Sequence, residues 1–202
     1  MRREELELLH RTIRECTGCP LQLSRRHAVP GEGPCDAGIF LIGEAPGAKE
    51  DETGRPFAGR AGKVLDGLLG GAGIARERVF ITSILKCRPP ANREPAKEEV
   101  IACLPYLWRQ LNLIRPMLVL PMGRHAVAHT FPLFGMEARR IGEVHGSIFD
   151  CIAPWGRVRV IPVYHPAAAT HNPGMREVLG SDFSLLRDFR ESRAMESIEP
   201  VE

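Results

Sequence analysis

Hydrophobic residues along the chain follow two patterns that alternate from one segment to the next. Short, uninterrupted apolar runs predict buried strands, because strands covered on both faces carry apolar side chains in both directions. The predicted strands cover residues 37–43, 79–84, 117–120 and 158–164. Between these runs, apolar residues recur every three or four positions, which is typical of helices that bury one face. The predicted helices cover residues 2–15, 60–72, 95–114, 124–130 and 175–193, and segment 141–152 alternates like an edge strand or a hairpin.

This alternation of strands and helices predicts an α/β fold in which helices cover both faces of a parallel sheet. Ligands of such sheets lie at the carboxyl ends of the strands. Polar clusters follow three of the predicted strands, at residues 43–47, 83–88 and 165–166. Because the carboxyl ends of parallel strands share one edge, we expect these clusters to form one functional site.

Composition and charge narrow the class of protein only a little. The chain has 202 residues, 44% of them hydrophobic and 26% charged, which suits one globular domain over residues 1–193 with a frayed tail over 194–202. The formal net charge of +2 excludes a general attraction to polyanions but leaves room for a local patch that binds nucleic acid. The sequence shows neither a secretory signal nor an apolar stretch of about 18 residues that would span a membrane, so we expect a cytoplasmic protein.

Four of the six cysteines have the spacing of metal ligands. Cys16 and Cys19 form a C-x-x-C pair, and Cys87 and Cys103 lie far downstream. In a reducing compartment such pairs are more typical of metal sites than of disulfides. Four thiolates suit both zinc and a [4Fe–4S] cluster, and their spacing alone does not choose between the two. Cys35 and Cys151 have no paired partner, and we expect them to be small buried apolar residues.

The long loop after the first predicted strand and the end of the last one carry further candidate residues. The loop over 44–59 is rich in glycine and matches neither a Walker A motif nor a dinucleotide fingerprint. Loops of this length inside an α/β unit are usually functional, and Phe57 in it could stack on a base. His165 ends the last strand and precedes Pro166, a position that is as typical of a structural histidine as of a functional one.

Taken together, the motifs resemble family 4 uracil-DNA glycosylases, the iron–sulfur members of the uracil-DNA glycosylase superfamily. They read GEAPG at 43–47, GRPFAGRAG at 54–62, KCRPP at 86–90 and HPA at 165–167. The resemblance covers roughly residues 5–190. It implies a three-layer α/β/α fold with a central, mostly parallel four-stranded sheet, and a monomer that acts on DNA at the nucleoid. It also implies a structural [4Fe–4S] cluster on Cys16, Cys19, Cys87 and Cys103.

The activity implied by the resemblance is removal of uracil from DNA. Such enzymes flip the nucleotide out of the duplex and hydrolyse its N-glycosidic bond, leaving an abasic site. The implied catalytic residues are His165, which would donate a hydrogen bond to the uracil O2, and Glu44, which would position water, stabilise the sugar cation or bound the pocket. The implied base-binding residues are Ala45, Phe57 and Ser83, and we expect the base to be held between the rings of Phe57 and His165. The implied contacts to the DNA backbone are Arg60, Lys86, Arg88 and His171.

The sequence departs from the family pattern at three places. Ser83 stands where the family usually has asparagine, whose amide offers both an acceptor and two donors to the uracil edge. Residues 169–171 replace a leucine pair and an arginine that wedge into the duplex, and the basic segment of the DNA-crosslinking relatives is missing between Arg88 and Glu94. We therefore do not expect covalent capture of DNA. Two alternatives stay open: the same fold acting on hypoxanthine, xanthine or mismatched thymine, and a non-catalytic iron–sulfur protein that binds DNA.

Overall fold

The centre of the molecule is a sheet of five strands. The computed structural model describes residues 1–170, 172–187 and 189. The strands are β1 (Ile39–Gly43), β2 (Phe80–Ser83), β3 (Leu118–Pro121), β4 (Phe149–Ala153) and β5 (Gly156–Val160), in the order β2-β1-β3-β5-β4. All neighbouring pairs are parallel except β4 and β5, which form an antiparallel hairpin at one edge. The expected four-stranded sheet thus gains a fifth strand, which lies in the segment predicted as an edge strand or hairpin.

All five predicted helices are present, and two short helices are added to them. They are α1 (Arg2–Arg14), α2 (Ala48–Thr53), α3 (Arg60–Gly71), α4 (Lys97–Ile114), α5 (Arg124–Thr130), α6 (Ile141–Val144) and α7 (Pro173–Ser184). The short helix α2 lies inside the loop after β1 and was not expected. The short helix α6 occupies the start of segment 141–152, where the alternation predicted an edge strand or hairpin and the strand begins only at Phe149. The last helix, α7, ends at Ser184, although residues 187 and 189 are again helical; residues 190–193 of the predicted helix and the expected frayed tail over 194–202 lie outside the described residues.

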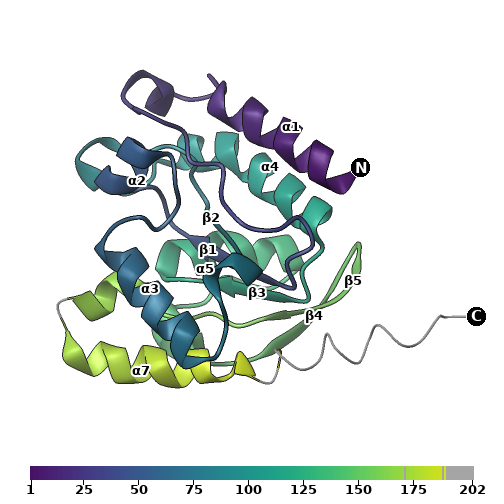
Figure 1. Ribbon diagram of the computed structural model, residues 1–202, viewed down its shortest axis with the longest axis vertical. Coiled ribbons are helices and arrows are strands. Elements are labelled where there is room, and N and C mark those ends of the chain that lie inside the picture. Colours follow the sequence, from purple (N-terminus) through teal and green to yellow (C-terminus); the bar gives the residue numbers. More distant parts are fainter. Residues whose placement is uncertain (171, 188, 190–202) are drawn as a thin grey trace, which may run out of the picture.

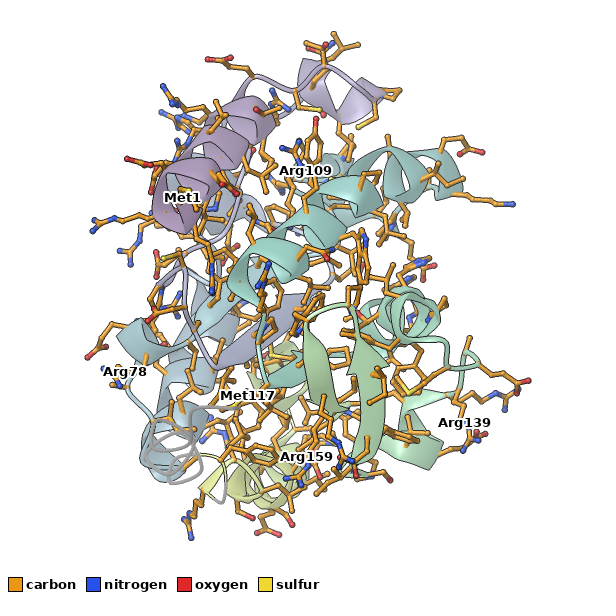
Figure 2. The ribbon with its side chains drawn as sticks, turned by 90° about the vertical axis from the view of Figure 1, so that its right-hand side faces the viewer. Met1, Arg78, Arg109, Met117, Arg139 and Arg159 are labelled. Carbon is orange, nitrogen blue, oxygen red and sulfur yellow. The ribbon has the colours of Figure 1, made fainter. Side chains whose placement is uncertain are left out.

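Two hydrophobic clusters cover the two faces of the sheet, as the pleat of β1 requires. Phe40 and Ile42 point into the cluster that contains α1 and α4, whereas Ile39 and Leu41 point into the cluster that contains α3 and α7. Figure 1 shows the sheet between these helices, and Figure 2, turned by 90°, shows α1 lying along α4 on one side. The predicted three-layer α/β/α arrangement is confirmed.

The carboxyl ends of the strands bring the polar clusters to one edge of the sheet. Gly43 at the end of β1 pairs in register with Ser83 at the end of β2. After β5 the chain continues alongside β3, where Val163 bridges Met122, and reaches His165 two residues later. The expected convergence of the three clusters therefore follows from the parallel register. Within the described part of the chain, no helix has the length and apolar character needed to cross a membrane.

Candidate active site and cysteine cavity

A cavity of about 270 Å³ opens at this edge of the sheet. Ala45, Phe57, Ser83 and His165 all line it, so four residues that were predicted from separate motifs meet at one site. Its volume lies just below that of typical ligand pockets, which run from about 300 to 1,000 Å³, and so suits one base better than a larger ligand. The sequence interpretation missed Glu50 and Asn92, which also line the cavity.

The rings of Phe57 and His165 lie against each other within this cavity. Their centroids are 5.5 Å apart and their planes are inclined by 28°. A third ring between them would need about 7 Å, two van der Waals contacts of about 3.5 Å each. The expectation that a base is held between the two rings is therefore wrong for this arrangement. Both rings instead belong to the wall of the cavity, where the imidazole lies against the phenyl ring.

Two glycines allow Phe57 to take this position. A Cβ on Gly43 would lie 2.9 Å from Phe57 Cζ and 3.1 Å from Ser83 Oγ, and one on Gly62 would lie 1.7 Å from the Phe57 carbonyl oxygen. A side chain at position 43 would displace the Phe57 ring, and one at position 62 would require the backbone to move. Phe57 itself adopts a positive φ of 50°, which is uncommon for an aromatic residue and typical of functional loops. The first turn of α3 thus lies directly against the backbone that carries the ring.

The hydrogen bonding of His165 fixes its tautomer. The backbone N–H of Ala167 donates to His165 Nδ1 over 3.2 Å, so Nδ1 carries a lone pair and the ring proton lies on Nε2. Burial lowers the pKa of His165 to about 4, although the Glu50 carboxylate acts in the opposite direction. At neutral pH the cavity is therefore lined by an uncharged imidazole whose Nε2–H is a hydrogen-bond donor.

Glu50 holds the two ends of the glycine-rich loop together. Its carboxylate accepts hydrogen bonds from the backbone N–H of Gly47 over 3.0 Å and from that of Gly59 over 2.8 Å. The first bond belongs to a capping box at the start of α2, and the second reaches the residue that precedes α3. A glutamate three residues after Gly47 was the sequence signal that could have revealed both the helix and the role of Glu50.

The carboxylate of Glu44 does not line the cavity but faces His125. Glu44 Oε2 is 4.0 Å from His125 Nε2, and Glu94 Oε2 is 3.9 Å from the same nitrogen. His125 Nε2 is buried and has no hydrogen-bond partner among the described residues. His125 thus stands between two acids at the start of α5, the helix that follows β3, and the sequence interpretation did not single it out. Its position directly after a strand end was the available signal.

The four predicted contacts to the DNA backbone have different outcomes. Lys86 is only 1% exposed, and its ammonium donates to Thr82 Oγ1 at 2.6 Å, to the Ser83 carbonyl at 2.7 Å and to Gln110 Oε1 at 2.8 Å. All three of its donors are used inside the protein, so the prediction that Lys86 contacts a phosphate is wrong. Arg60 is exposed at the start of α3, and Arg88 donates from Nε to Asn92 Oδ1 over 2.8 Å. His171 lies outside the described residues.

The four predicted metal ligands line a second cavity, which lies between α1, α4 and the segment after β2. These residues are Cys16, Cys19, Cys87 and Cys103. N–H groups donate to three of the sulfurs: Arg25 Nη1 to Cys87 at 3.1 Å, the Lys86 backbone to Cys103 at 3.2 Å and the Gly18 backbone to Cys16 at 3.3 Å. Such donors commonly surround thiolates that bind metal, since they stabilise negative charge on sulfur.

The chemistry of these thiols fits a metal centre. Burial raises the pKa of Cys103 to about 11 and also raises the pKa of Cys87, so both stay protonated unless a cation takes the place of their protons. Among the described histidine, cysteine, aspartate and glutamate side chains, no three stand close enough to bind a single metal ion. Cys151 is buried in the hydrophobic core, as expected, and Cys35 packs against the same core while half-buried.

Comparison with known proteins places this geometry in a family. Residues 30–187 match the family model described as the uracil DNA glycosylase superfamily. The chain belongs to this superfamily. It is 44% identical to the type-4 uracil-DNA glycosylase of Saccharolobus solfataricus over 191 residues, which cover 94% of this chain and 88% of that protein.

Two further relatives agree in name and in coverage. The type-4 uracil-DNA glycosylase of Archaeoglobus fulgidus is 45% identical over 91% of this chain and 92% of that protein. The type-4 uracil-DNA glycosylase of Thermotoga maritima is 40% identical over 93% of this chain and 96% of that protein. The resemblance inferred from the four motifs is therefore confirmed, and it extends over nearly the full length of this chain and of each relative.

Proposed function

We propose that this protein is a DNA repair glycosylase that flips uracil out of DNA and hydrolyses its N-glycosidic bond, leaving an abasic site. The observation that carries the proposal is the base-sized cavity at the carboxyl edge of the sheet, lined by a neutral His165 with its proton on Nε2. The names of the type-4 relatives agree with this function. The substrate is DNA, on which we propose that the protein acts as a monomer at the nucleoid.

The chemistry of bond cleavage matches what the cavity offers. As the glycosidic bond breaks, negative charge develops on the departing uracil and positive charge on the sugar. A fixed N–H donor that meets the developing anion lowers the barrier, and His165 Nε2 supplies such a donor without having to change its protonation. Phe57 provides an apolar wall for the ring, and the Ala45 backbone and Ser83 provide polar contacts. Glu44, whose carboxylate lies outside the cavity beside His125, is our candidate for placing water or stabilising the sugar cation.

A panel of oligonucleotides with single lesions tests this proposal. We expect release of uracil from U·G, U·A and single-stranded substrates, and His165→Ala should lower the single-turnover rate by about 10²–10³ because one donor to the developing anion is lost. Arg157→Gln, a charge change at the start of β5 far from the cavity, serves as the matched control and should keep full activity. No release of any base, with DNA binding retained, would favour the non-catalytic reading instead.

A second candidate function, a shifted or broader base specificity, is favoured by Ser83. The residue is 7% exposed, lines the cavity and offers one hydroxyl, where the amide of asparagine would offer an acceptor and two donors. The same panel should therefore include hypoxanthine, xanthine and T·G lesions. Uracil specificity predicts that Ser83→Asn raises the rate on uracil by about tenfold, about the value of one added hydrogen bond. The second candidate would be supported if Ser83→Asn lowered the rate on uracil and if the wild-type protein released another base faster than uracil.

We further propose that Cys16, Cys19, Cys87 and Cys103 hold a [4Fe–4S] cluster. The supporting observations are four thiols at one cavity and the N–H groups that donate to three of them. When bound, the cluster supplies a structural link between the N-terminal segment and the core rather than a step of the reaction. Anaerobically purified protein should contain about four irons per chain and absorb broadly at about 400 nm. A colourless protein with stoichiometric zinc would contradict this assignment.

A further inference from the structure

A second concave surface lies beside the base cavity, between α3 and α7. We call it the α3–α7 groove; it has a volume of about 380 Å³ and is lined by Lys63, Val64, Gly67 and Leu68 of α3 and by Arg176 of α7. The two helices pack side by side, as Figure 1 shows. Lys63 and Arg176 are exposed, so two cations border a surface whose floor is backbone and apolar side chain.

Both walls of the groove connect directly to the base cavity. On the α3 wall, Ala61 lines the base cavity and Gly67 lies six residues later, about 9 Å along the helix at 1.5 Å per residue. On the other wall, Arg176 Nε donates over 3.3 Å to the carbonyl of Ala169, in the 3₁₀ turn that directly follows His165. A polymer that places one unit in the base cavity would therefore bring its neighbouring units to the groove.

The charge of the groove is positive and open to solvent. Neither Lys63 nor Arg176 forms an ion pair with any carboxylate in the described part of the chain. Asp66, the acid nearest in sequence to Lys63, is engaged by Arg76 Nη1 at 2.8 Å. Glu177, which directly follows Arg176, is exposed and does not line the groove. In addition, α3 starts beside the base cavity, one residue before Ala61, so its positive N-terminal end adds to the same field.

We propose that the α3–α7 groove binds the sugar-phosphate backbone of the DNA next to the everted nucleotide. The inference rests on the proposed function and adds to it a site for the flanking phosphates. Lysine and arginine contacts to phosphate position a duplex without reading its sequence, which is what an enzyme that searches for a rare lesion requires. Gly67 leaves the floor accessible, because a Cβ at this position would meet nothing within 4 Å.

The salt dependence of DNA binding tests the groove. The probe is a short duplex carrying a non-hydrolysable 2′-fluoro-2′-deoxyuridine opposite guanine, with Kd measured over a range of salt concentrations. Each phosphate contact contributes about 0.9 to the slope of log K against log salt, so the double variant Lys63→Gln/Arg176→Gln should lose about 2 from the slope and bind at least about tenfold more weakly at low salt. Arg157→Gln, which removes one charge at the start of β5, should keep the wild-type slope.

A second pair of variants guards against a general effect of charge or folding. Gly67→Glu places a carboxylate on the groove floor, where the structure has room for it, and should weaken binding clearly more than Ile152→Glu, which adds the same charge at a 76% exposed position on β4. The inference would be overturned if the double variant kept the wild-type salt slope, or if Arg157→Gln lost as much slope and affinity as the double variant. Uracil release by the wild-type protein with an unchanged slope would overturn the groove alone. A reduced slope without any base release would overturn the proposed function alone.

Discussion

A single backbone contact sets the chemical state of His165. Because Ala167 N–H donates to Nδ1, a proton on that nitrogen would face another proton, and only Nε2 is left to carry one. Burial acts in the same direction by disfavouring the charged ring. A neutral donor is well suited to a leaving group that becomes an anion, since it stabilises the anion without first losing a proton to solvent.

The tautomer of His165 can be measured directly. Its pKa of about 4 in the folded protein lies below the usual 6.5, so the ring should stay neutral with the proton on Nε2 at pH 6. Long-range ¹H–¹⁵N correlation spectra of uniformly labelled protein report the protonation of each ring nitrogen. The signal is assigned by its loss in His165→Gln. A charged imidazole at pH 6, or a proton on Nδ1, would contradict this account of the site.

At the scale of elements, α3 connects the base cavity to the rest of the fold. Its first turn contributes Ala61 to the cavity and packs on the Phe57 backbone through Gly62, and its buried face joins the core through Leu65 and Leu69. A helix that contains four glycines has weak intrinsic helix propensity, so tertiary contacts account for much of its stability. Small changes at Gly62 should therefore reach the cavity.

Replacement of Gly62 should demonstrate this coupling. In Gly62→Ala the new Cβ would lie 1.7 Å from the Phe57 carbonyl oxygen, so either α3 or Phe57 must move. We expect a loss of about 2 kcal/mol in unfolding free energy, because the new methyl group overpacks the site. Uracil release should be at least about tenfold slower, because Phe57 would be displaced in the cavity. Urea denaturation and single-turnover kinetics measure the two effects.

Gly70→Ala is the matched control for this experiment. It lies on the same helix, and a Cβ there would meet nothing within 4 Å. Because alanine favours a helix over glycine by up to about 1 kcal/mol, this variant should be as stable as the wild type or more so, with unchanged activity. If both variants behaved alike, the close packing of Gly62 on Phe57 would not matter for the site.

Elements with a clear period could be predicted from the sequence, whereas contacts between distant segments could not. The strands and long helices follow from apolar spacing, and their register explains why Ser83 and His165 meet. The burial of Lys86 depends on Gln110, 24 positions away in another element, and no local pattern reveals such a partner. The contact of Phe57 with His165 likewise joins two loops, so the resemblance to a family named the residues but not their arrangement.

For the molecule as a whole, buried histidines make stability depend on pH. Burial lowers the pKa of both His10 and His165 to about 4 in the folded protein, whereas both should titrate at about 6.5 when the chain is unfolded. Between these values the unfolded state binds more protons than the folded state. The unfolding free energy must therefore fall as the pH is lowered from 6.5 toward 4, and it is insensitive to these two groups above 6.5.

His10 offers a test of this dependence away from the base cavity. It is 6% exposed, its ring lies 6.1 Å from that of Phe80, and its Nε2 has no hydrogen-bond partner among the described residues. His10→Leu should leave stability at pH 7 unchanged or higher, because it removes a buried polar atom without a partner. At pH 4.5 the unfolding free energy of the variant should exceed that of the wild type by about a further 2 kcal/mol. The reason is that each unit of pKa difference between the folded and unfolded states costs the wild type about 1.4 kcal/mol in acid.

Thermal or urea unfolding of both proteins at several pH values provides the measurement. If the unfolding free energies of the wild type and of His10→Leu changed with pH in parallel, His10 would not contribute to the loss of stability in acid.

The cysteine cavity also sets an order for the making of each molecule. Its four thiols come from positions between 16 and 103, and the last of them lies in the middle of α4. During synthesis, Cys16 and Cys19 are translated long before Cys103, so more than 80 further residues are added before the last of the four thiols is present. A metal centre bound by all four thiols can form only after β1, β2 and the first two turns of α4 have been translated, so its insertion comes late in the synthesis of the chain.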